Sequence, residues 1–119
     1  MEIGFASVKC KRKCTKLADI YNTAAKKGRV CKDRNANIYA KIISFFASCD
    51  NFDMAMKAPS FKTFRGHALT GNLKGKWSFD MEHPKRFVFA VVCDKRRKDG
   101  SFDYASAKKI YIHDIVDYH

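Results

Sequence analysis

The first part of the chain changes from the hydrophobic spacing of a strand to that of a helix. Between residues 2 and 8, Ile3 and Phe5 fall on one side, which predicts a short strand. A helical stripe follows, and lysines and arginines fill much of the remaining surface. We therefore predict an amphipathic helix over about residues 11–27, ended by Gly28. Its apolar stripe consists of Cys10, Cys14, Leu17, Ile20, Tyr21 and Ala24.

A second helix is predicted from about residue 35 to residue 49, because apolar side chains again recur at helical spacing. Residues 50–60 contain the turn-forming pairs Asp50-Asn51 and Pro59-Ser60, which predict a loop between a helical half and a sheet half. The stripe of the second helix consists of Ile38, Ile42, Phe45, Phe46 and Cys49.

Beyond this loop the hydrophobic period becomes two, as in strands. A strand around residues 76–81 and a tight turn at residues 82–85 precede a nearly continuous apolar run over residues 86–93. Such a run predicts a central strand covered on both faces. A charged loop over residues 94–104 and a last strand over about residues 108–116 complete the prediction. The inward positions of the strand at residues 76–81 are Trp77, Phe79 and Met81, and those of the strand at residues 86–93 are Phe87, Phe89, Val91 and Cys93.

The order of these elements predicts an α+β fold in one domain over residues 1–119. Helices segregated in sequence from strands that short turns connect are typical of helices packed on one face of a small antiparallel sheet. A chain of 119 residues is too short for two separate cores.

Charge points to a polyanionic partner. The 24 Lys and Arg residues outnumber the 12 Asp and Glu residues, which gives a net charge of +12. Nucleic acid is the first expectation, and an acidic protein or a membrane surface comes behind it. A basic surface that serves only solubility is the alternative. We expect RNA-binding cations on the first helix and in the charged loop, namely Lys13, Lys16, Lys95, Arg96 and Arg97.

Other classes of function find little support. The chain starts without a signal-peptide pattern and has no apolar stretch long enough to span a membrane, so we expect a cytoplasmic protein. The five cysteines lack framework spacing, which predicts free thiols. The pair Cys10 and Cys14 lies on an apolar stripe without further ligand pairs, so we expect no metal site. Gly66, Gly71 and Gly75 form no nucleotide-binding motif, and no cofactor is expected.

The second half of the chain carries side chains suited to cleaving RNA without a metal. In that reaction a base deprotonates the 2′-hydroxyl, cations stabilise the charged phosphorane, and an acid protonates the leaving 5′-oxygen. Imidazoles, Arg and Lys supply all three roles. A passive RNA-binding face explains the same residues equally well. They are His67, Lys74, Lys76, Arg86, His113 and His119.

Four segments resemble the HigB branch of the RelE/ParE toxins. They are residues 67–71 (HALTG), 75–79 (GKWSF), 86–89 (RFVF) and 117–119 (DYH). That branch carries H-x-L-K-G, G-x-W-S-I, a W-R-I-x-F-like strand and often a final D-Y-H, in the same order. The resemblance covers residues 35–119 well, whereas the first 34 residues match only in being basic and strand or helix.

This resemblance implies a RelE-like fold and a toxin of a type II toxin–antitoxin system. Such a toxin is an endoribonuclease that cleaves messenger RNA in the decoding region of the small ribosomal subunit, and a HigA-like helix-turn-helix antitoxin holds it inactive. By motif position, Arg86 would contact the scissile phosphate and His119 would transfer protons, while His67 would do either. Thr70 stands where the branch has lysine, and Lys74 and Lys76 are the candidates to replace that cation.

Three alternatives remain open from the sequence. The first is a ParE-like toxin of the same fold that inhibits gyrase, although positioned histidines favour the nuclease. The second is an RNA-binding module without catalysis. The third is a degenerate, inactive toxin, which the substitution at Thr70 keeps open. Fold alone does not separate these activities.

Overall fold

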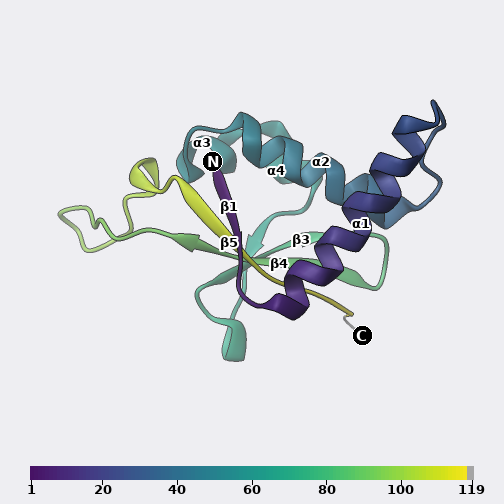
Figure 1. Cartoon of the computed structure of the whole chain (residues 1–119). Coiled ribbons are helices and arrows are strands. Elements are labelled where there is room, and N and C mark those ends of the chain that lie inside the picture. Colours follow the sequence, from purple (N-terminus) through teal and green to yellow (C-terminus); the bar gives the residue numbers. More distant parts are fainter. Residues whose placement is uncertain (118–119) are drawn as a thin grey trace.

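Helices cover one face of a five-stranded sheet in a computed structural model that describes residues 1–117 (Figure 1). This layering confirms the predicted α+β class. The elements are β1 (Glu2–Phe5), α1 (Val8–Lys26), α2 (Arg34–Ser48), α3 (Phe52–Lys57), α4 (Pro59–Thr63), β2 (His67–Ala68), β3 (Lys76–Asp80), β4 (Lys85–Val92) and β5 (Lys109–Asp117), with single 3-10 turns η1 (Gly71–Leu73) and η2 (Tyr104–Ser106).

The sheet is mixed, with the strand order β1-β5-β4-β3-β2. Neighbouring strands are antiparallel except at one edge, where β1 pairs parallel with β5 and Glu2 lies opposite Lys109. The prediction of an antiparallel sheet is therefore wrong at that edge. Strand β4 lies between β3 and β5, and three consecutive residues at its middle, residues 87–89, are fully buried. The middle of β4 is therefore covered on both faces, as predicted.

Capping side chains set the helix boundaries. Helix α1 begins at Val8, three residues before its predicted start, because the Ser7 hydroxyl accepts a hydrogen bond from the Cys10 N–H at 3.0 Å. It ends before Gly28, whose φ of 63° is the left-handed conformation that glycine favours. The Asp33 carboxylate caps α2 by accepting from the Ala36 N–H at 2.9 Å.

The loop predicted over residues 50–60 is wrong, because this segment forms the short helices α3 and α4. The Asn51 side chain caps α3 by accepting from the Met54 N–H at 2.8 Å, and Pro59 occupies the first turn of α4. Each helix also buries one phenylalanine, Phe52 or Phe61. The residues that suggested a turn are helix starts instead.

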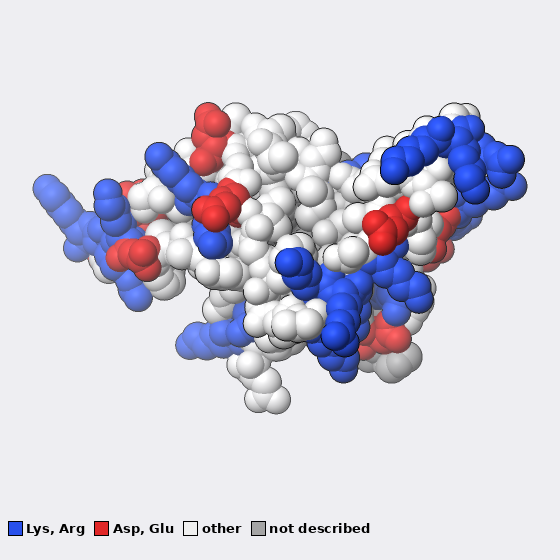
Figure 2. All heavy atoms as spheres, viewed as in Figure 1, with Lys and Arg blue, Asp and Glu red and all other residues white. Residues whose placement is uncertain are grey.

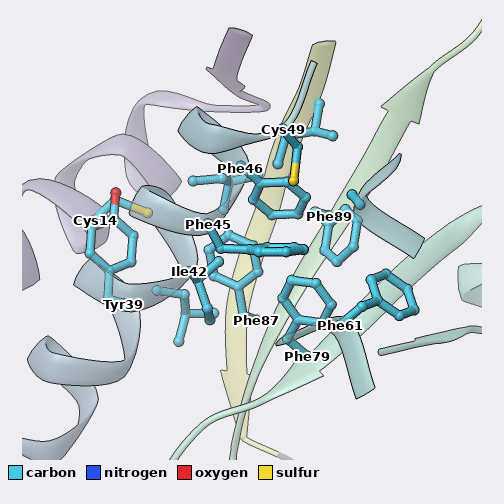
Figure 3. Packing of buried hydrophobic residues seen from close by; sticks show 14 of the residues in the cluster. Cys14, Tyr39, Ile42, Phe45, Phe46, Cys49, Phe61, Phe79, Phe87 and Phe89 are labelled. Atoms are coloured by element: carbon cyan, nitrogen blue, oxygen red, sulfur yellow. The ribbon is translucent and has the colours of Figure 1, made fainter. Parts of the chain in front are cut away.

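The core is a group of packed phenylalanines between the helices and the sheet (Figure 3). Phe79 of β3 lies at its centre and is fully buried. Its ring stacks on Phe46 of α2, with the centroids 5.5 Å apart, and lies 4.9 Å from the ring of Phe89. Trp77 packs edge-on against Phe52 at 5.1 Å, so it contributes to the core as the alternation predicted.

A β-bulge interrupts the last strand. Val88 pairs with Asp114 and Phe89 with Ile112, so His113 is an additional residue without a partner in the β4–β5 register. Strict alternation would have placed His113 on the same side as Tyr111. The bulge removes it from that series, and the pattern of apolar residues alone does not reveal this.

Within residues 1–117 none of the helices combines the length and the apolar character that crossing a lipid bilayer requires.

We predict that Phe79→Ala lowers the free energy of unfolding by about 3–5 kcal/mol, because the truncation removes buried surface and leaves a cavity among packed rings. Urea denaturation followed by circular dichroism measures the loss. Phe102→Ala is the control, since that ring is 40% exposed and its removal is expected to cost less than about 1 kcal/mol. Equal losses in the two variants would contradict the central role of Phe79.

Candidate active site

The sheet face opposite the helices carries the polar residues that the sequence singled out. Residues paired directly across strands project on the same side. His67, Ser78 and Val88 form one row across β2, β3 and β4, and Asp80 pairs with Arg86 in the next row. These residues alternate with the buried phenylalanines, so they lie on the other side of the sheet, where surrounding side chains cover Ser78 and Val88 completely while His67 is exposed. We name this side the open face.

On the open face the Asp80 carboxylate holds two arginines. Its Oδ1 atom accepts a hydrogen bond from the Arg86 guanidinium, and its Oδ2 atom lies 3.6 Å from the Arg65 guanidinium. Arg86 is about two-thirds buried, whereas Arg65 is largely exposed. One carboxylate therefore fixes two guanidinium groups that come from different segments of the chain.

The corner before β2 places Arg65. Its φ of 57° is left-handed, a conformation that costs a non-glycine residue roughly 1–2 kcal/mol. Gly66 follows, and a Cβ atom there would lie 2.5 Å from the ring of Phe61. The Asp80 N–H donates to the Phe64 carbonyl at 2.9 Å and ties the corner to β3. Backbone contacts therefore hold the corner close to the Asp80 carboxylate.

The same corner orients His67. The ring Nδ1 lies 2.8 Å from the Arg65 carbonyl oxygen, and the side chain is exposed. A carbonyl oxygen only accepts hydrogen bonds, so Nδ1 carries a proton. In the neutral ring Nε2 is then the atom with the free lone pair, directed away from the corner. This tautomer equips His67 to accept a proton at Nε2.

His67 and Arg86 are close enough to act on one phosphodiester. Two strand spacings of about 4.8 Å and two residues of about 3.4 Å rise along β4 place their Cα atoms roughly 12 Å apart. Lys76 pairs with Ala90 in the row on the other side of His67. A histidine, a guanidinium pair and a lysine thus surround the middle of the open face. Oriented donors and cations of this kind stabilise a phosphorane.

Lys74 and Thr70 belong to the β2–β3 connection, which projects from the sheet on the side away from the helices (Figure 1). Both residues are exposed, whereas Lys76 on β3 is half-buried. Of the two candidates to replace the lysine absent at Thr70, only Lys76 belongs to the paired rows of the open face.

Lys13 and Lys16 lie on α1 and not on the strands of the open face. The Lys13 ammonium forms a salt bridge with the Asp114 carboxylate at 2.9 Å and donates to the Ile115 carbonyl at 3.2 Å. Burial alone would raise the pKa of Asp114, but the hydrogen bonds from Lys13 and from the Ile115 N–H outweigh it and lower that pKa. Lys13 therefore already has a structural role, while Lys16 is exposed.

The predicted cations of the charged loop lie at one end of the molecule, at the left of Figures 1 and 2. Arg96 stacks 4.1 Å above the Phe102 ring and donates to the Gly100 carbonyl at 3.0 Å. An isolated bridge between Arg96 and Phe102 closes this loop. Lys95 and Arg97 are exposed beside them, so the loop presents its cations from an ordered turn.

His119 lies outside the described residues. The neighbouring described residue, Asp117, forms a salt bridge with Lys85 at 2.8 Å. The structure therefore brings His67, Arg86 and Lys76 together on one face. It places the charged loop at one end of the molecule (Figure 1).

The paired thiols of α1 are core groups. Cys14 packs against Tyr39 (Figure 3), and burial raises the pKa of its thiol to about 12. Cys10 donates from Sγ to the Ile112 carbonyl at 3.3 Å. Among residues 1–117, His, Cys, Asp and Glu side chains form no group of three that would hold a metal ion.

Sequence reasoning missed Arg65 and Asp80. One signal for the corner was present, because Arg65-Gly66 follows an apolar segment and precedes His67, as at many helix ends. The only signal for Asp80 was its alternation with buried residues of β3, which indicates a face but not a partner.

We predict that Asp114→Asn destabilises the protein by about 1 kcal/mol or less at pH 7, because both partners of the Lys13 salt bridge are about one-third exposed. The folded-state pKa of Asp114 is lowered, so its stabilisation is complete above the unfolded value of about 3.9 and is lost as pH falls through the lower folded value. The urea midpoints of wild type and Asp114→Asn, measured at pH 7, 4 and 2.5, should approach each other as the pH falls. Asp19→Asn is the exposed control on α1, and a pH-independent difference would contradict the charge argument.

The comparisons with known proteins establish the fold. No protein-family profile matches the sequence, and no curated protein does. Among solved structures, a YoeB/ParE toxin from Agrobacterium tumefaciens matches over 100% of both chains, with 12% sequence identity and a TM-score of 0.50. At this identity the similarity concerns the backbone fold alone. The chain therefore shares the backbone fold of this YoeB/ParE toxin.

Proposed function

We propose that this chain is the toxin of a type II toxin–antitoxin pair and a metal-independent endoribonuclease that cleaves messenger RNA on the translating ribosome. We further propose that it belongs to the HigB branch, acts in the cytoplasm as a single toxin domain over residues 1–119, and is held inactive by a HigA-like helix-turn-helix antitoxin. The motifs at residues 67–71, 75–79, 86–89 and 117–119 and the RelE/ParE-like fold support this proposal.

The observation that carries the proposal is the pairing of an oriented histidine with anchored arginines. The Nδ1 contact of His67 leaves Nε2 as the proton acceptor, and Asp80 holds Arg86 and Arg65 on the same face. A protein that only binds gyrase or RNA needs no such tautomer. This arrangement favours the nuclease over the gyrase-inhibiting and passive alternatives.

In the proposed reaction a base removes the proton from the RNA 2′-hydroxyl, and the 2′-oxygen attacks the adjacent phosphorus. The bond from phosphorus to the 5′-oxygen breaks while an acid protonates that oxygen. The products are a 2′,3′-cyclic phosphate and a 5′-hydroxyl. His67 and His119 are the proton-transfer groups, and Arg86, assisted by Arg65 and Lys76, stabilises the charge on the phosphorane.

The other cations would hold RNA away from the reacting bond. Lys74, Lys16 and the charged loop with Lys95, Arg96 and Arg97 are exposed and suited to phosphate contacts. The Lys13 ammonium already forms a salt bridge with Asp114, so we propose that Lys13 contributes less to RNA binding than the other cations do. Such contacts make binding strongly dependent on salt.

We predict that Arg86→Ala and His67→Ala each reduce messenger RNA cleavage by 100-fold or more, because each removes a group that acts in the transition state. Inducible expression in a bacterial host, with growth curves and mapping of cellular RNA 5′ ends, measures this together with His119→Ala. His83→Ala is the matched control, since it removes an exposed histidine in the β3–β4 turn.

Cuts within coding regions that His83→Ala retains and the other variants abolish are the expected result. Growth arrest with intact messages, together with loss of supercoiling by purified gyrase, would overturn the nuclease proposal in favour of the gyrase-inhibiting alternative. Absence of both arrest and cleavage in the wild type would instead support an inactive toxin or a binding module.

We predict that Asp80→Asn slows cleavage about 10- to 100-fold, because the amide no longer holds both guanidinium groups by charge and small displacements at a reacting centre are costly. Single-turnover cleavage on programmed ribosomes separates the maximal rate from the half-saturating concentration. The maximal rate should fall more, which marks a positioning role. Asp53→Asn is the control, since that carboxylate pairs with Lys57 on α3. An unchanged maximal rate would refute the positioning role.

A further inference from the structure

The last residue of α1 and the connection from α1 to α2 carry a further group of cations outside the open face. Four cationic side chains fall within seven residues, and all four are exposed. We name them the hairpin tip: Lys26, Lys27, Arg29 and Lys32. None of these residues belongs to the motifs of the proposed nuclease, so the open face does not explain them.

The hairpin tip is an ordered turn. Gly28 adopts a φ of 63°, and the Arg29 N–H donates to the Ala24 carbonyl at 2.9 Å, which closes the end of α1. The Asn37 side chain donates to the Cys31 carbonyl at 2.7 Å, and Cys31 is buried. The cations are therefore presented from a fixed backbone.

Acidic side chains do not neutralise this charge. Within residues 1–117, the four lysines and arginines of the hairpin tip form no salt bridge with an acidic group. The neighbouring Asp33 carboxylate accepts the capping hydrogen bond of α2 and offsets at most one of the four charges, and Arg34 pairs with Glu82 at 3.2 Å. Four like charges beside a single carboxylate create a strong local positive potential.

The hairpin tip lies at one end of the elongated molecule, whose longest extent is 52 Å (Figure 1). Figure 2 shows blue side chains gathered at this end, at the upper right, at the opposite end, where the charged loop lies, and at the lower centre over the N-terminal part of α1. The α1–α2 pair extends past the sheet to reach this position (Figure 1). The tip is thus separate from the open face and free to contact another surface.

The chemistry of the tip suits phosphates better than a protein or a membrane. It exposes one large apolar side chain, Val30, which is 87% exposed. A protein interface requires an apolar centre, and membrane insertion requires a broad apolar face, so one valine supports neither. Phosphate contacts require fixed cations and little else. Double-helical RNA presents phosphates at high density along two strands.

We propose that the hairpin tip binds the phosphate backbone of double-helical RNA and anchors the protein on ribosomal RNA while the open face reaches the message. The ribosomal assignment rests on the proposed function. Binding to duplex RNA by the tip does not, because it requires no cleavage. The two proposals can therefore fail separately.

The test compares Lys27→Ala/Arg29→Ala/Lys32→Ala with wild type for binding to a 2′-O-methyl RNA duplex, which cannot be cut through its 2′-oxygen. Fluorescence anisotropy at several salt concentrations gives the slope of log affinity against log salt. Three lost contacts should reduce that slope by about 2–3 and the affinity on the order of 100-fold at about 0.1 M salt. Lys41→Ala/Lys57→Ala/Lys62→Ala is the control, since it removes equal charge from exposed helix positions and should change the slope by less than about 1.

Equal slopes for the two triple variants would overturn the proposal, because net charge and not the tip would then govern binding. The proposal would also be wrong if the tip variant retained duplex binding but lost binding to phosphatidylserine vesicles. His83→Ala, which removes an exposed turn residue outside the tip and the open face, should bind the duplex with an unchanged slope. If the wild type cleaves no message yet the tip variant loses duplex affinity, the proposed function fails and the tip proposal stands.

Discussion

The packing of Phe79 against the rings of α2 and β4 is the contact on which the arrangement of the molecule depends. Phe46, Phe87 and Phe89 surround it, so the second helix and the middle of the sheet form one aromatic layer. Because aromatic rings pack with defined geometry, this layer fixes which face of the sheet the helices cover. The opposite face stays available for polar side chains, and His67, Asp80 and Arg86 occupy it.

Local patterns predicted most of the fold. The stripes of α1 and α2 and the alternation in β3 and β4 mark their elements because each buries one side. The helices α3 and α4 escaped prediction, since Asn51 and Pro59 are common both in turns and at helix starts. The parallel pairing of β1 with β5 escaped because no local pattern specifies which distant strand completes a sheet.

The candidate site likewise contains residues that local patterns reveal and residues that only the tertiary structure brings together. His67, Lys76 and Arg86 were accessible because they lie in short motifs of strands and strand ends. The link from Asp80 to Arg65 depends on a left-handed corner tied to β3 by one backbone hydrogen bond. Such a link arises from tertiary structure. Its members look unremarkable in sequence, where one is an acid in an alternating strand and the other an arginine before glycine.

The position of β5 in the sheet affects how the protein folds during its synthesis. This strand is made after the other four, yet it lies between β1 and β4. While the chain is being synthesised, β1 has no neighbour and β4 has only one, so the sheet cannot close until the last strand has emerged. A protein with the proposed activity would thus lack its complete sheet until β5 has left the ribosome.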